Sequence, residues 1–179
     1  MPAGTATRAR IALVALVVLA GCEVFHSDSE NLVRQQRAER ERRIAGMRTA
    51  TQQAAPGRRL TGDALAVAVR GRTHIFAYAV APGGTARRYV EYSFFRADGH
   101  FVYRNSQWAT DPDGREGDRW RVSDEDLCVV SGEFTSDERC YALTALPDGR
   151  VQYFIHAPGD ETDGLLTKVT DEIRDGAAP

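Results

Sequence analysis

The apolar run near the N-terminus ends in a cysteine that directly follows small residues, because residues 19–22 read Leu-Ala-Gly-Cys. The thiolate of a cysteine is a nucleophile, so Cys22 can carry a covalently attached group. Two arginines and no acidic residue precede the run, and residues 11–20 are all apolar. A positive segment, an apolar segment and small residues at its end are the parts of a cleaved secretory signal. The sequence therefore predicts a signal peptide over residues 1–21.

Residues 19–22 resemble the lipobox of bacterial lipoproteins, in which the chain is cut before the cysteine and lipid is attached to its sulfur. The resemblance implies a palmitate-type lipid on Cys22 and a mature chain that faces the periplasm from a membrane. The apolar run of ten residues is about half of the roughly 20 that span a bilayer, so a spanning anchor is not expected. Glu23 rather than an aspartate follows Cys22, which in enterobacteria-like sorting implies the outer membrane, with the inner membrane as the alternative. An ordinary secretory signal with a chance cysteine is the other interpretation.

Two further cysteines, Cys128 and Cys140, remain once Cys22 carries lipid. In an oxidising compartment two such cysteines are expected to pair, and two free thiols are the alternative. The chain has no C-x-x-C motif, so a redox-active pair is not indicated.

One acidic loop is the best candidate for a metal site, because it places four carboxylates within eight residues: Asp111, Asp113, Glu116 and Asp118. Ca²⁺ prefers several oxygen ligands, and the Asp-x-Asp-Gly order resembles the start of a calcium-binding loop. Arg115 then interrupts the pattern, and no glutamate stands at the twelfth position. An acidic turn between two strands, with its angles set by proline and glycine, is the competing interpretation.

Catalytic motifs are not evident elsewhere. The four histidines are all more than four residues apart, so they form no local metal motif, and a spatial cluster stays open. There is no Gly-x-Ser-x-Gly elbow, and no glycine pair precedes a phosphate-binding helix. The acidic residues 124–126 are better explained by a solvated loop than by glycosidase chemistry. The sequence predicts no catalytic residue and no cofactor.

Charge is unevenly distributed, although the formal net charge is −2. Residues 23–59 carry eight arginines against five acidic residues, whereas residues 60–179 carry 13 basic against 20 acidic residues. Residues 31–54 lack proline and have a helix-forming composition without a continuous apolar stripe. We expect residues 22–58 to form a solvated helical or disordered tether, or a basic arm on anionic lipid headgroups. The acidic remainder argues against nucleic acid as a partner.

Residues 59–179 have the pattern of a mainly β domain. A short helix is expected over residues 62–69, followed by closely spaced β-rich runs separated by turn dipeptides. This pattern predicts an antiparallel meander, either barrel-like or a sandwich, stapled by Cys128 and Cys140. The expected strands cover residues 73–78, 89–95, 100–105, 119–122, 127–130, 140–145, 151–156 and 165–170.

This domain also contains a series of short motifs, in the order Gly71-Arg72-Thr73, Asp98-Gly99, Gly117-Asp118-Arg119-Trp120, Leu127-Cys128, Cys140-Tyr141 and Asp148-Gly149. The order resembles small secreted proteins of Gram-negative bacteria, a loose group of domains without an established activity. The resemblance implies an all-β periplasmic domain with a disulfide. It differs from the lipocalins, whose Gly-x-Trp signature lies on the first strand.

The sequence thus favours a membrane-anchored envelope lipoprotein whose β domain is a non-catalytic module that binds an envelope protein or polymer. A carrier or sensor with a small apolar ligand in a barrel cavity is the alternative. It arises because residues 89–95 carry aromatic side chains on both faces, which suits either a packed core or a cavity. A hydrolase with a site assembled from distant residues is the third interpretation.

Overall fold

The computed structural model of the chain comprises two compact units, Met1–Gly46 and Met47–Pro179. It describes residues 6–78, 89–107, 113–123, 125–132 and 135–177.

Helix α1 (Ala6–Gln52) makes up the described part of the first unit, and its last residues, from Met47 on, belong to the second unit. Its described side chains before Ile44 are exposed, as expected for a tether without an apolar stripe. Arg34 pairs with Glu30 and Arg37 with Glu41, one turn apart, and each such pair stabilises a helix by about 0.2–0.5 kcal/mol. The tether is therefore helical over most of its length. None of the helices that the structure describes is both long and apolar enough to cross a bilayer.

The second unit consists of short strands and one further helix. In chain order these are β1 (Arg58–Arg59), α2 (Gly62–Val69), β2 (Arg72–Tyr78), β3 (Tyr89–Phe95), β4 (Phe101–Asn105), β5 (Arg119–Val122), β6 (Leu127–Ser131), β7 (Thr135–Ala145), β8 (Val151–His156), β9 (Leu166–Val169) and β10 (Glu172–Asp175).

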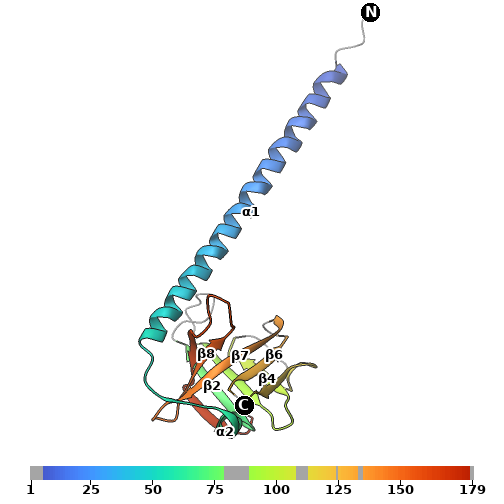
Figure 1. Ribbon diagram of the computed structural model, residues 1–179. Coiled ribbons are helices and arrows are strands. Elements are labelled where there is room, and N and C mark those ends of the chain that lie inside the picture. The colour runs from blue at the N-terminus through green and yellow to red at the C-terminus, as the bar shows by residue number, and fades with distance from the viewer. Residues whose placement is uncertain (1–5, 79–88, 108–112, 124, 133–134, 178–179) are drawn as a thin grey trace, which may run out of the picture. The chain divides into compact units, whose positions relative to one another are not determined.

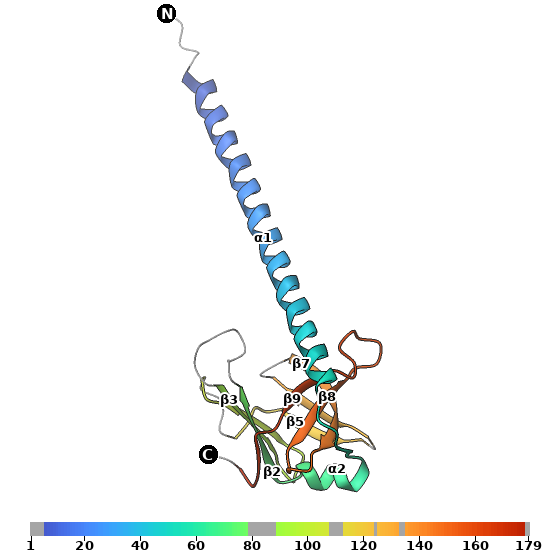
Figure 2. The ribbon, with the colours of Figure 1, turned by 90° about the vertical axis from the view of Figure 1, so that its left-hand side faces the viewer.

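Within the described residues, the strands form two antiparallel sheets. One sheet has the order β5-β6-β7-β8-β9, with β1 beside β7, and the other has the order β10-β2-β3-β4. Figure 1 shows the two sheets as facing layers with α2 at one end, and Figure 2 shows the same arrangement from the side. The predicted mainly β, antiparallel fold is confirmed. The sheets are not closed into a barrel, and of its two predicted forms the sandwich fits better.

The apolar core lies between the sheets and beneath α2. Leu65 and Val69, one turn apart on α2, are fully buried, so the helix packs onto the core by a single face. Gly71 follows the helix with φ +72°, a conformation that favours glycine, and its N–H donates a 2.7 Å hydrogen bond to the Phe95 carbonyl. Other core side chains come from both sheets: Phe76, Phe95, Phe101, Trp120, Leu127, Leu143 and Val151.

The second unit begins before the expected boundary after residue 58, because the preceding segment is bonded to the sheet. The Leu166 N–H donates to Thr51 Oγ1 at 2.8 Å, and β1 pairs with the end of β7. At Gly57 a Cβ atom would lie 2.5 Å from the Ala145 carbonyl oxygen, so only glycine fits this close approach. The end of α1 and the linker after it are thus part of the domain.

Candidate functional site: a polar cavity between the sheets

The inner face of β3 is unexpectedly polar. Burial alternates along the strand, and the buried positions include Glu91 and Ser93. The more apolar alternate face, with Val90, Tyr92 and Phe94, is only half-buried on the outside of the sheet. Because successive side chains point to opposite faces of a strand, the register of β3 places a carboxylate inside the sandwich.

Lys168 on β9 neutralises this carboxylate from the facing sheet. Its Nζ atom lies 2.5 Å from Glu91 Oε1, and the two side chains are only 16% and 8% exposed. The ammonium also lies 4.1 Å from the centre of the Phe76 ring and 5.4 Å from that of Tyr153. The pair joins the two sheets across the core, with aromatic faces as its surroundings.

Lys168 of this ion pair lines a small cavity of about 30 Å³, which is room for water-sized groups. Asp137 and Arg139, both exposed, lie at its outer part, so the cavity opens to solvent. The walls combine polar and aromatic side chains from both sheets: Ser93, Phe95, Phe101, Val129, Ser131, Tyr141, Tyr153 and Lys168.

Lys168 and Glu91 were not expected as site residues, yet the sequence carries a signal for one of them. Lys168 is the only lysine in a chain that has 23 basic residues. A strong preference for arginine is typical of a composition effect, so a position that nevertheless keeps lysine is a candidate for a specific role. The exception proves to be the cation that is largely buried between the sheets.

A second buried polar group, His74 on β2, also contacts Tyr153. His74 is fully buried, and its Nε2 donates a 3.0 Å hydrogen bond to the Ala68 carbonyl. Its Nδ1 accepts a 2.5 Å hydrogen bond from the Tyr153 hydroxyl, so the ring is neutral and both nitrogens are used. Burial lowers the pKa of His74 to about 4. Burial also raises the pKa of Tyr153 well above its ordinary value, which keeps its donor proton in place. His74 thus links α2 to the sandwich core.

This arrangement predicts a loss of stability in mild acid. The folded pKa of His74, about 4, lies below the ordinary value of 6.5, so the unfolded chain takes up the proton first. The contribution is complete above pH 6.5 and is lost as the pH falls from 6.5 towards 4, for a total of about 3 kcal/mol. Urea unfolding at several pH values measures it. His74→Gln keeps a donor and an acceptor but does not titrate, so its stability should change less over this range. An equal pH dependence in both proteins would contradict the assignment.

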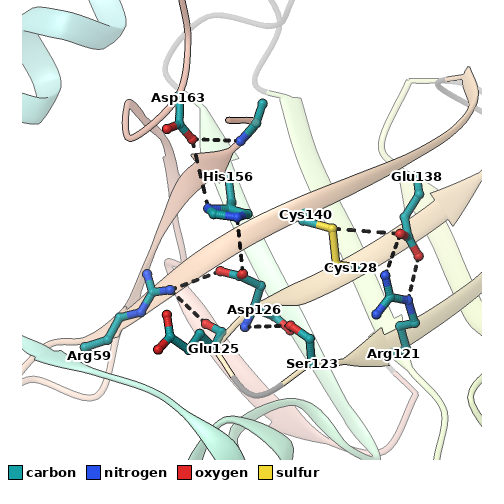
Figure 3. The surroundings of a disulfide bond; sticks show 11 residues. Arg59, Arg121, Ser123, Glu125, Asp126, Cys128, Glu138, Cys140, His156 and Asp163 are labelled. Carbon is teal, nitrogen blue, oxygen red and sulfur yellow. Dashed lines mark hydrogen bonds and ion pairs between the residues drawn. A yellow bond between two sulfur atoms is a disulfide. The ribbon is translucent and has the colours of Figure 1, made fainter. Parts of the chain in front are cut away.

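The disulfide lies on the opposite face of the larger sheet. Cys128 on β6 and Cys140 on β7 are directly paired in the register, and their sulfur atoms are bonded at 2.03 Å. Because Leu127 points into the core, Cys128 points outward, away from the cavity. Figure 3 shows Arg121 and Glu138 beside the disulfide, joined by two hydrogen bonds of 2.8 and 2.7 Å. These hydrogen bonds lower the pKa of Glu138. The structure contains the predicted disulfide between Cys128 and Cys140.

The acidic run 124–126 has a structural role where it is described. Asp126 accepts a 3.0 Å hydrogen bond from Arg59 of β1, and His156 Nε2 lies 3.6 Å from its other oxygen (Figure 3). The other nitrogen of His156 lies 4.0 Å from Asp163. These contacts fasten the β5–β6 turn to β1 and β8.

The acidic loop that was the candidate for calcium is only partly described, since Asp111 lies outside the described residues. The carboxylate of Asp118 is buried and accepts hydrogen bonds from Ser131 Oγ at 3.3 Å and from the Gly132 N–H at 2.8 Å. Asp113 uses its backbone carbonyl, which lies 3.0 Å from His100 Nε2, and Glu116 is exposed. Asp118 therefore holds the β6–β7 turn in place.

Metal ligands do not gather around this loop in the part of the chain that the structure describes. There, the only group of His, Cys, Asp or Glu side chains close enough to share an ion is Cys128, Glu138 and Cys140. Its two sulfur atoms are bonded to each other. Calcium binding by this loop remains the less favoured of the two interpretations drawn from the sequence, after the acidic turn.

Cys22 lies within helix α1, and its side chain is outside the described part of the structure. Its attachment to lipid is therefore argued from the sequence alone. No protein-family model, no curated protein and no solved structure matches the chain.

Proposed function

We propose that this chain is a lipoprotein of a bacterial envelope, held to a membrane by lipid on Cys22, whose β domain is a non-catalytic binding module. The observation that carries the proposal is the cysteine directly after small residues at the end of the apolar run. The disulfide supports it, because such bonds persist in oxidising compartments outside the cytoplasm. With Cys128 and Cys140 paired, Cys22 is the one cysteine left for lipid. Glu23 favours the periplasmic face of the outer membrane over the inner membrane.

The cavity beside Lys168 supports a binding role for the domain, with an envelope protein or polymer as the partner. At this cavity the sandwich interior, in which Lys168 is largely buried, opens to solvent. A carrier of an apolar ligand is less well supported, because an apolar group in this cavity would cover the Lys168 ammonium without offering it a hydrogen bond. The arginine-rich helix after Cys22 would lie next to the headgroups to which lipid brings it, and each arginine there contributes about 1 kcal/mol.

Cys22→Ala should abolish the incorporation of labelled palmitate and release the protein from membranes, or leave it with an uncleaved signal. The reason is that both the cut and the acylation require the cysteine sulfur. Membrane fractionation of cells grown with labelled palmitate measures both effects. Cys128→Ser is the matched control, and it should retain label and membrane attachment. Mature Cys22→Ala protein on membranes would show that something other than lipid holds it there.

A further inference from the structure

The ammonium of Lys168 has hydrogen-bonding capacity that its neighbours do not use. An ammonium carries three N–H donors, and of the described residues only Glu91 is hydrogen-bonded to it. The nearby rings of Phe76 and Tyr153 offer faces rather than lone pairs. Since Lys168 also lines the cavity, an acceptor atom placed there would gain a hydrogen bond from a largely buried charge.

The charges around the cavity are balanced, which selects against a charged ligand group. The Lys168 ammonium in the cavity wall is already paired with Glu91, and Asp137 and Arg139 bring one charge of each sign to the lining. A carboxylate in the cavity would come close to Glu91, and a cation would come close to Lys168. A neutral hydrogen-bonding group meets neither repulsion.

The volume of the cavity and the chemistry of its walls further limit which neutral ligand groups can enter it. About 30 Å³ admits a group of the size of water, but not a ring or an alkyl chain. A hydroxyl group both donates and accepts hydrogen bonds. It can therefore accept one from the Lys168 ammonium and donate one to the hydroxyl oxygen of Ser93 or Ser131, which also line the cavity. The rest of such a ligand would lie at the opening, against the half-buried Tyr141, with Asp137 and Arg139 as further hydrogen-bonding partners.

We infer that the cavity beside Lys168 binds a neutral saccharide by taking up one of its hydroxyl groups. The inference rests on the proposed binding role of the β domain and names the class of its ligand. A saccharide provides many hydroxyl groups and an apolar ring face without a net charge, which is the combination that this cavity accepts.

Nuclear magnetic resonance of the lipoprotein in detergent micelles, labelled with ¹⁵N only in lysine, tests this directly. With a single lysine, the spectrum contains one ammonium resonance, and that resonance reports on the cavity. Cellobiose, maltose and di-N-acetylchitobiose are the neutral saccharide probes. Acetate, laurate and N-acetylalaninamide represent carboxylate, apolar and peptide ligands. We expect a saturable shift with at least one saccharide and none with the other three compounds.

Two exposed variants locate the binding without disturbing the core. Asp137→Asn and Arg139→Gln should each weaken saccharide binding about tenfold, as expected for the loss of a hydrogen bond to a charged group. Glu138→Gln changes the same strand on its opposite face and should bind as the unaltered protein does.

The inference is overturned if no saccharide shifts the ammonium resonance, if only N-acetylalaninamide or laurate does, or if both cavity variants bind normally. The mass of the same sample shows whether Cys22 carries lipid. Failure of saccharide binding in a lipid-bearing protein therefore overturns the ligand class alone, whereas absence of lipid overturns the proposed attachment.

Discussion

Replacing Lys168 with methionine should lower the free energy of unfolding by about 3–5 kcal/mol. Methionine keeps most of the side-chain length but removes the charge, and Glu91, only 8% exposed, would be left inside the sandwich without its partner. A buried charge that loses its partner is costly because it keeps the desolvation penalty and loses the compensating attraction. Urea unfolding of the full chain, followed by circular dichroism, measures the change.

The double variant Lys168→Met with Glu91→Gln separates the charge from the packing. With both charges removed, the interior keeps side chains of similar volume, so the double variant should be more stable than Lys168→Met alone. A double variant that is no more stable than the single one would mean that packing of the lysine stem, not the ion pair, accounts for the loss.

Removing the disulfide should lower the melting temperature of the domain by roughly 10 °C. The bond closes a loop with a sequence separation of 12 residues, and the chain-entropy model assigns about 3 kcal/mol to a loop of this size. The variant is Cys128→Ser with Cys140→Ser, so that no free thiol remains in the domain. Thermal unfolding in the absence of reductant gives the comparison.

Reduction of the unaltered protein provides the matched control. A dithiol reductant should lower its melting temperature to that of the double serine variant, which should itself not respond. If the fully reduced protein melts at the same temperature as the oxidised one, the bond does not contribute to stability.

Most of the fold follows from local signals in the sequence. Strands joined by short turns, such as the pair on either side of Asp98-Gly99, were predicted nearly to the residue, because turn dipeptides and alternating patterns coincide there. Two of the short strands, β1 and β10, were not predicted. Arg58–Arg59 and Glu172–Asp175 have little apolar character, and they are strands only because β7 and β2 offer partners.

The candidate site was harder to predict, for a physical reason. On β3 the more apolar set of alternate residues lies outside, and the set with Glu91 lies inside. The sequence pattern of β3 alone cannot show which of its two faces is buried. The burial of Glu91 depends on Lys168, 77 residues further along the chain, because an opposite charge offsets the cost of burying the carboxylate. The disulfide needed no such partner information, since only two cysteines remained once Cys22 was assigned to lipid.

Intact mass spectrometry of the protein extracted from membranes tests the central claim most directly. The account predicts a chain that begins at Cys22, carries added acyl mass on its first residue, and is two hydrogens lighter than the reduced chain because Cys128 and Cys140 are bonded. A mature chain that begins at another residue, or that begins at Cys22 without acyl mass, would contradict it.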